Sequence, residues 1–293
     1  MLRVYFGHHK CASQYIKAIL LRVTDLLGMG PHRVDNFSAA LPLDYHTREP
    51  FITLLEEHRQ RLRSEPLATL FLTNGDREAV GLLDGRNEPY RGFHVIRDPR
   101  DIIVSAYFSH LYSHPIRSEG GWIGEFRRQL QAVDDIERGL LLELDFNAPI
   151  LAAMADWDYA HPRIYETRYE TLIADPQAEF CRILNFVGIA TPRWGALTRL
   201  GLILDQVRRR RTNRPMPRRT TLPLPVLQRI LAAHAFERKA GGRQPGEEDA
   251  RHHYRKGVPG DWRNYFTPQV TAAFKKRYGG LLVTLGYEKG TDW

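Results

Sequence analysis

The chain has 293 residues, enough to bury a large core, and its 43% hydrophobic and 26% charged residues are the shares of an ordinary globular protein. Two cysteines, Cys11 and Cys181, cannot form a disulfide framework, and no apolar run approaches the roughly 20 residues of a membrane span, so we expect a cytoplasmic protein. The net charge of +8 suits an anionic partner, without choosing between nucleic acid, an acidic membrane surface and a phosphorylated small molecule.

The first segment has the outline of a phosphate-binding loop. An apolar stretch, Leu2–Phe6, is predicted to be a strand and is followed by a glycine, a loop that carries Lys10 and a helix expected over about 13–27. The apolar residues of that helix recur at helical spacing, at Ile16, Ile19, Leu20 and Val23. The glycine pattern of nucleoside triphosphatases, G-x-x-x-x-G-K-[ST], is nevertheless absent.

Three further apolar segments are predicted to be buried strands, at Ala68–Asn74, Gly92–Asp98 and Arg163–Tyr169. A helix is expected directly after Asp98, which is placed to cap it with Pro99 at its first position. Another amphipathic helix is expected around Gln177–Val187.

This alternation predicts a single α/β domain over residues 1–293, with a central, P-loop-like parallel β-sheet flanked by helices on both faces. Ligands of such sheets bind beyond the carboxyl ends of the strands. Four residues at or just past predicted strand ends should therefore converge: Lys10, Asn74, Arg97 and Tyr169. Residues 199–225 and 240–251 are predicted to be mobile loops bordering this site, and the first contains an arginine-rich run from Arg208 to Arg219.

Two further segments carry cations that suit a phosphate. In HVIRDPRDIIVSAYF, Arg97 closes a strand, and Ser105 lies in the following helix, whose N-terminus also favours an anion. In HYRKGVPGDWRNYFT, Arg255 and Lys256 precede Gly257, whose flexible backbone N–H can face an anion as well. Each segment alone is equally consistent with salt-bridged or solvated surface residues.

Taken in order, the three segments resemble the donor-binding signature of sulfotransferases that use 3′-phosphoadenosine 5′-phosphosulfate (PAPS), above all the cytosolic branch and its bacterial relatives. The resemblance extends from residue 4 to about residue 267. It implies transfer of a sulfuryl group to a hydroxyl or amine of a small-molecule, lipid or carbohydrate acceptor. The product would be adenosine 3′,5′-bisphosphate (PAP), and no metal would be required.

The resemblance also implies a role for each motif residue. Lys10 would face the bridging oxygen between phosphate and sulfuryl group, where charge develops as the S–O bond breaks. The 5′-phosphate would be held by the backbone N–H groups of Cys11, Ala12, Ser13 and Gln14. The 3′-phosphate would be held by Arg97, Ser105, Arg255, Lys256 and Gly257. Three aromatic side chains would surround the adenine: Tyr15, Tyr169 and Phe236.

The catalytic base is not where the family has it. Cytosolic members carry Lys-Thr-His at the end of the second strand, whereas this chain has Leu72-Thr73-Asn74, and an asparagine cannot accept the proton. We predict that Asp76 or His9 serves as the base. The other candidates left open are His8, His46, His110, His114, Asp35 and Asp44.

No metal site is expected. His110 and His114 are four positions apart and resemble a two-histidine metal pair, but the sequence shows no third ligand beside them.

Two other functions remain open at this point. A nucleoside or nucleotide kinase with an atypical phosphate loop is one, although no magnesium-binding carboxylate motif accompanies it. A PAPS- or PAP-binding protein with impaired catalysis is the other, suggested by Leu72 and Asn74. Nucleic acid is not expected, because the arginine-rich run lacks the interleaved aromatic residues of single-strand binders. The sequence leaves the acceptor and the oligomeric state open, a homodimer included.

Overall fold

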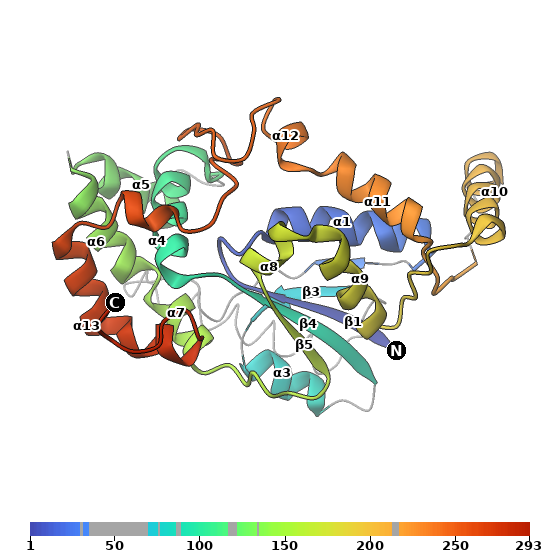
Figure 1. Ribbon diagram of the computed structural model, residues 1–293, viewed down its shortest axis with the longest axis horizontal. Helices are drawn as coiled ribbons and strands as arrows, with labels where there is room; N and C mark the ends of the chain where they lie inside the picture. Colours follow the sequence, from blue (N-terminus) through green and yellow to red (C-terminus); the bar gives the residue numbers. More distant parts are fainter. Residues whose placement is uncertain are drawn as a thin grey trace.

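The computed structural model describes residues 1–29, 32–34, 70–75, 77–85, 89–116, 122–133, 135–212 and 217–293. A sheet of five parallel strands lies at its centre, in the spatial order β2-β3-β1-β4-β5 (Figure 1). The strands are β1 (Leu2–Gly7), β2 (His32–Val34), β3 (Leu70–Asn74), β4 (Tyr90–Ile96) and β5 (Ile164–Arg168). The predicted parallel α/β fold is confirmed, and the short strand β2 is an addition that the sequence did not indicate.

Burial on both faces explains why β1 is apolar at almost every position. Leu2, Val4 and Phe6 belong to a cluster that includes buried side chains of α3 (Arg77–Asp84). Tyr5 points to the opposite face and joins the cluster formed with α1 (Ser13–Leu26). A strand covered on both sides reads as a continuous apolar run, as central strands of parallel sheets do.

The helices form two groups. On one face of the sheet lie α1, α8 (Tyr169–Ala174), α9 (Pro176–Phe186) and α11 (Leu224–Ala233) (Figure 1). Beyond the carboxyl ends of the strands lies a separate helical cluster: α4 (Pro99–Phe108), α5 (Trp122–Gln131), α6 (Ile136–Phe146), α7 (Ala148–Ala155) and α13 (Pro268–Thr284). The edge of the sheet where ligands are expected therefore faces the junction between the two groups.

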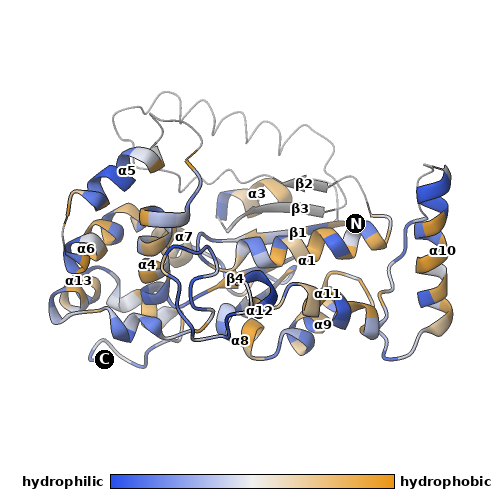
Figure 2. Ribbon diagram, turned by 90° about the horizontal axis from the view of Figure 1, so that it is seen from above, coloured by the Kyte–Doolittle hydropathy of each residue, from blue (hydrophilic) through white to orange (hydrophobic). Residues whose placement is uncertain are grey.

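The prediction of a loop over 199–225 is wrong for its first half. Residues Ala196–Thr212 form helix α10, which lies at one end of the molecule (Figures 1 and 2) and contacts the core through Leu202. Its apolar side chains at Leu197, Leu200, Ile203, Leu204 and Val207 follow helical spacing but remain exposed. The second predicted loop, 240–251, contains no helix or strand, as expected. Among the described helices, none has an apolar stretch as long as a membrane span requires.

The N-terminus of α4 is fixed as the sequence predicts. Asp98 caps the helix by accepting a hydrogen bond from Arg100 N at 2.9 Å, and Pro99 occupies the first turn. The Arg100 side chain, only 2% exposed, pairs with Asp98 and with Glu288 near the C-terminus. Its guanidinium also lies 3.9 Å from the ring centroid of Trp262 and 4.4 Å from that of Trp293.

Asp101, in the first turn of α4, holds the C-terminal motif in place. Its two carboxylate oxygens accept hydrogen bonds from the backbone N–H of Gly260 at 2.6 Å and of Trp262 at 2.9 Å. Trp262 lies in the short helix η2 (Asp261–Asn264). Because these two bonds join segments far apart in sequence, they bring the 255–257 stretch to the start of α4.

We predict that Asp101→Ala lowers the free energy of unfolding by about 2–4 kcal/mol, because two buried N–H groups lose a charged acceptor. Asp145→Ala is the matched control, since Asp145 is exposed and pairs only with Arg277 on the surface, and it should change stability by about 0.5 kcal/mol or less. Urea unfolding of both variants measures the difference. Equal effects would show that Asp101 does not anchor the C-terminal motif.

Candidate functional site

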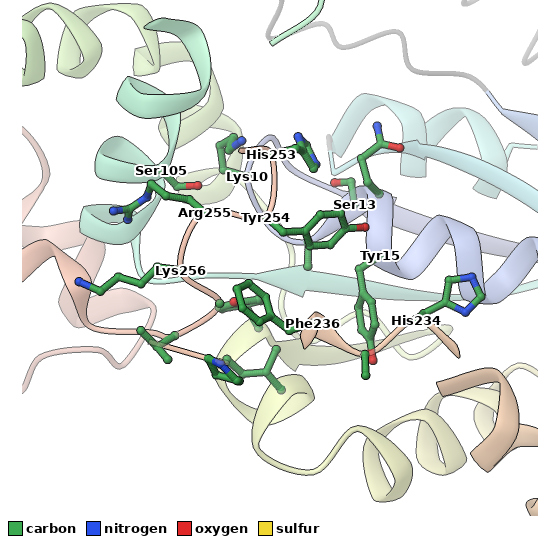
Figure 3. Close-up of a pocket in the computed structure, with 18 of the residues that line it drawn as sticks. Lys10, Ser13, Tyr15, Ser105, His234, Phe236, His253, Tyr254, Arg255 and Lys256 are labelled. Atoms are coloured by element: carbon green, nitrogen blue, oxygen red, sulfur yellow. The ribbon is translucent and has the colours of Figure 1, made fainter. Parts of the chain in front are cut away.

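A cavity of about 1400 Å³ lies beyond the carboxyl ends of the strands. Its walls come from the β1–α1 loop, the start of α4, α8, the region around α12 (Phe236–Lys239) and the 253–259 segment. Figure 3 shows Ser105, Arg255 and Lys256 at one end of it and Tyr15 and His234 at the other, with Phe236 and Tyr254 between them. Segments from the beginning, middle and end of the chain thus share one space.

The β1–α1 loop has the backbone of an anion-binding nest. Lys10 and Ala12 have φ angles of 63° and 58°, and they are the only non-glycine residues with positive φ in the part of the chain that the structure describes. Such strain is concentrated at functional sites, and left-handed residues in a loop turn successive N–H groups toward one concave side. Helix α1 follows with Ala12 at its cap position and no side-chain cap, so its first N–H groups remain available to a ligand.

The residues predicted to bind the donor line this cavity, with one exception. They are Lys10, Ala12, Ser13, Gln14, Tyr15, Arg97, Ser105, Tyr169, Phe236, Arg255, Lys256 and Gly257. Cys11 is the exception, because its side chain is fully buried in the helical cluster and its N–H donates to His8 O at 3.3 Å. The hydroxyl of Ser13 also donates to His8 O, at 3.0 Å, which ties the loop together.

Arg97 connects the loop to α4. Its Nη1 donates to Lys10 O at 3.2 Å, and its guanidinium lies 4.5 Å from the ring centroid of Tyr169. The Arg97 side chain is buried, and its Nε has no hydrogen-bond partner among the described residues. A buried donor without a partner is costly, so an acceptor supplied by a ligand would relieve a real deficit.

The two cations of the C-terminal motif are held by carboxylates. Arg255 pairs with Asp261 and Glu248, and Lys256 Nζ lies 2.6 Å from Asp261 Oδ1. The Arg255 guanidinium also lies 4.5 Å from the ring centroid of Phe108. These contacts fix the direction of both side chains at the wall of the cavity.

The position of the Phe236 ring requires a glycine at residue 257. Its φ is +71°, and a Cβ placed there would lie 2.5 Å from the ring of Phe236. Only glycine therefore permits this backbone and this ring position together. Phe236 faces Tyr15 across a gap in Figure 3, an arrangement suited to a flat ring between them.

The pKa of Lys10 is lower than that of an ordinary lysine. Burial, together with the positive charge of Arg97, lowers the pKa of Lys10 to about 8, although Glu143 opposes the shift. An anion in the cavity would restore the charged form.

A chain of side chains leads from the cavity wall into the helical cluster. His9 Nε2 lies 3.0 Å from His110 Nε2, and His110 Nδ1 lies 2.8 Å from Glu143 Oε1. Glu143 is fully buried, and its other oxygen accepts from Asn147 Nδ2 at 2.7 Å. Burial and the neighbouring His110 lower the pKa of His9 well below the usual value, so the neutral form of His9 is favoured.

A second chain of the same composition lies in the core. His8 Nε2 is 2.8 Å from His94 Nε2, and His94 Nδ1 is 2.7 Å from Glu166 Oε2. None of these three residues lines the cavity. The chain fills the space beneath Gly75, where a Cβ would lie 2.6 Å from His8 Nε2. His8 is therefore a packing residue rather than a base.

A third histidine lies beside the pair that the sequence indicated. Ring nitrogens of His9, His110 and His114 all lie within 4.8 Å of one another. The other base candidates, Asp76, Asp35, Asp44 and His46, lie outside the described residues, as do the side chains of Leu72, Thr73 and Asn74.

His253 and Tyr254 are lining residues that the sequence reasoning passed over. They directly precede the Arg-Lys-Gly motif, and Figure 3 places His253 beside Lys10. Lys10 contributes to lowering the pKa of His253, after burial. Their proximity to the motif was the available signal, but nothing in the spacing showed which side of the segment faces the cavity.

The fold is that of a parallel α/β protein, and its β1–α1 loop lacks the glycine pattern of nucleoside triphosphatases. Residues 88–214 match the model of the sulfotransferase domain family. The structure is similar to that of mouse sulfotransferase SULT7A1 complexed with PAP, with a TM-score of 0.54, 14% identity and coverage of 96% of this chain and 83% of that one. It also aligns with retinol dehydratase in complex with androsterone and inactive cofactor PAP, with a TM-score of 0.48, 16% identity and coverage of 96% and 80%.

A comparison with curated proteins gives no significant match. The sulfotransferase domain match over residues 88–214 and the similar fold agree with the resemblance that the three motifs indicated.

We predict that stability falls as pH rises from 6.5 to 8, because Glu166 stays protonated in the folded state while it is ionised in the unfolded chain. Burial raises the pKa of Glu166 to about 8, so the folded protein holds a proton that the unfolded chain has already released. Burial lowers the pKa of His94 to about 3, so its effect on stability is confined to lower pH. Glu166→Gln keeps the hydrogen bonds without titrating and should abolish a fall of about 1–2 kcal/mol.

Urea unfolding at several pH values in this window measures the slope for both proteins. Parallel slopes for wild type and Glu166→Gln would contradict the assignment of a protonated Glu166 at neutral pH.

Proposed function

We propose that this protein is a PAPS-dependent sulfotransferase (transferase class EC 2.8.2) that transfers a sulfuryl group to a hydroxyl or amine. The observation that carries the proposal is that Lys10, Arg97 and Arg255 line one cavity although they lie far apart in sequence. A donor with anions at both ends of one nucleoside matches this arrangement. A nucleoside triphosphate concentrates its charge at one end and would leave the Arg255 end unused.

The donor is proposed to lie with its 5′ end at the β1–α1 loop and its 3′-phosphate near Arg97, Ser105 and Arg255. The uncapped start of α1 supports the first placement, and the unpartnered Nε of Arg97 supports the second. The gap between Tyr15 and Phe236 suits the adenine. PAP would be the product, and neither PAPS nor PAP needs a metal for this binding mode.

The transfer step is an in-line displacement. The acceptor oxygen forms a bond to sulfur while the bond from sulfur to the bridging phosphate oxygen breaks and PAP leaves. Lys10 stabilises the negative charge that develops on that bridging oxygen. The proton of the acceptor passes to a base.

His9 is the base that we favour. We assign the Nδ1 proton of His110 to its bond with Glu143, so that His110 Nε2 accepts the Nε2–H of His9. His9 Nδ1 then carries a lone pair for the acceptor proton, and the buried Glu143 stabilises the charge passed along the chain. His9 lines the cavity directly beside Lys10, which places it next to the proposed reacting atoms.

A kinase and a catalytically impaired binding protein remain as alternatives. The absence of the nucleoside triphosphatase glycine pattern disfavours the kinase. The His9–His110–Glu143 chain disfavours the impaired protein, because it replaces the base that Asn74 cannot provide. The acceptor is proposed to be a small molecule, a lipid or a carbohydrate, and a cytoplasmic location and a homodimer both stay predictions.

Lys10→Ala and Arg255→Ala separate the two ends of the donor site. Lys10→Ala should mainly lower turnover, whereas Arg255→Ala should mainly weaken donor binding. Each loses one charge-assisted contact, an effect of about tenfold or more. The measurement is PAP formation from PAPS with a panel of alcohols, phenols and amines. Unchanged donor affinity in Arg255→Ala would remove Arg255 from the site, and full turnover in Lys10→Ala would refute the role of Lys10.

For the base, His9→Gln should lower turnover about 100-fold or more while leaving PAP affinity within a factor of about three. Asp76→Asn is the matched comparison, since the sequence offers it as the competing base. A wild-type rate in His9→Gln together with a large loss in Asp76→Asn would transfer the role to Asp76.

A further inference from the structure

Three histidines near Lys10 form a cluster that the transfer step does not fully use. His9 comes from the β1–α1 loop, whereas His110 lies in the π-helical turn η1 (Ser109–Ser113) that follows α4, and His114 comes directly after that turn. Their ring nitrogens lie within 4.8 Å of one another. From this geometry we propose that His9, His110 and His114 form a site for one divalent transition-metal ion of the zinc class, with a fourth coordination position open to the cavity.

The backbone is shaped to bring two of the ligands together. The chain leaves α4 through a π-helical turn, η1 (Ser109–Ser113), in which His114 N donates to Ser109 O at 2.7 Å. Arg127 of α5 then donates to the carbonyl oxygens of both His110 and His114, each at 2.6 Å. Widened turns of this kind occur mostly at functional sites. The backbone at the two histidines is thus fixed by contacts that do not involve their own side chains.

Each ring from this turn is also oriented through its Nδ1 atom. His110 Nδ1 lies 2.8 Å from Glu143 Oε1, and His114 Nδ1 lies 3.2 Å from Pro115 O. Metal-binding histidines usually donate one ring N–H to a carboxylate or carbonyl, which directs the other nitrogen to the metal. Glu143, fully buried and held by Asn147, supplies the carboxylate partner and one compensating negative charge.

The distance between His9 and His110 suits a small ion with nitrogen ligands, and a His114 nitrogen lies within 4.8 Å of both. Two nitrogens bound tetrahedrally at 2.0–2.1 Å from Zn²⁺ are about 3.3 Å apart. The Nε2 atoms of His9 and His110 are 3.0 Å apart, so the rings must separate by a few tenths of an ångström and tilt toward the ion. Three imidazoles favour Zn²⁺, Co²⁺, Ni²⁺ or Cu²⁺ over Mg²⁺ or Ca²⁺, which prefer oxygen ligands.

The cluster is open to the cavity on one side only. His9 and His114 line the cavity, whereas His110 lies behind them. An ion bound here would therefore face the cavity with its remaining position, as in catalytic rather than structural zinc sites.

The site has a consequence for the proposed reaction. A metal ion that binds the Nε2 atom of His9 breaks the hydrogen bond of that atom to His110. Metal binding and proton acceptance through the His9–His110–Glu143 chain are therefore mutually exclusive. The metal-loaded enzyme should consequently lose turnover that depends on His9, and a chelator should restore it. This consequence rests on the proposed function, whereas metal binding itself does not.

Metal binding is tested on the full chain without an affinity tag, after treatment with a chelator. Equilibrium dialysis against Zn²⁺ should give one bound ion per chain, and Co²⁺ should give the strong visible absorption of a tetrahedral complex. His114→Gln and Glu143→Gln should each weaken binding about tenfold or more. His161→Gln is the control, because His161 pairs with Asp84 away from the cluster and should leave binding unchanged.

His114 is only partly buried, so His114→Gln keeps the test decisive even if a change at the buried Glu143 impairs folding. Absence of saturable binding, or binding that is equal in wild type and His114→Gln, would overturn the proposal. Because dialysis needs neither donor nor acceptor, failure of sulfuryl transfer in every assay would refute the proposed function and leave this result intact.

Discussion

Positive charge gathered in one cavity is the constraint on which the rest of the structure depends. Arg97 lies close enough to Lys10 to disfavour its charged form, and Arg255 adds to this effect on the pKa of Lys10, after burial. The protein moderates this repulsion with carboxylates behind the cations: Asp101 near Arg97, and Asp261 and Glu248 on Arg255. These carboxylates orient the cations without filling the cavity, so an anionic ligand is the natural complement. The strained Lys10 loop and the Arg97 side chain both line this cavity.

Two chains of identical composition, each with two histidines and one glutamate, start from the adjacent residues His8 and His9. Their environments give them different roles. The His8 chain is enclosed by the core, where it satisfies buried polar groups, and the His9 chain ends at the cavity wall. Environment rather than residue type therefore separates a packing histidine from a functional one. The same surroundings bring His114 to His9, which makes proton transfer and metal binding alternatives at one nitrogen.

Much of the fold could be predicted because its signals are local. The run Leu2–Phe6, the glycine after it and the Asp98-Pro99 cap each specify their own structure through burial or capping, and the structure has them in the expected places. Helix α10 was missed because its arginines and the nearby prolines suggested a loop, although the spacing of Leu197, Leu200 and Leu204 is helical. Most apolar side chains of α10 are exposed in the described structure, so composition alone could not distinguish this helix from a loop.

The site was only partly predictable for a different reason. The motifs around Lys10, Arg97 and Arg255 could be placed together through their resemblance to a family, and the structure brings them into one cavity. The contact between His9 and His110 joins positions 101 residues apart and depends on the π-helical turn. A π-helical turn has no characteristic periodicity in the sequence. The sequence therefore indicated His9 as a base candidate but not its contact with His110.

The central claim is that one ligand must carry anions at both ends. Thermal stabilisation by PAP, by AMP, which lacks the 3′-phosphate, and by ATP with Mg²⁺ tests it directly, because a ligand that binds only the folded state raises Tm in proportion to its binding free energy. The account predicts that PAP raises Tm well above both other nucleotides. Equal stabilisation by PAP and AMP, or a larger effect of ATP with Mg²⁺, would contradict it.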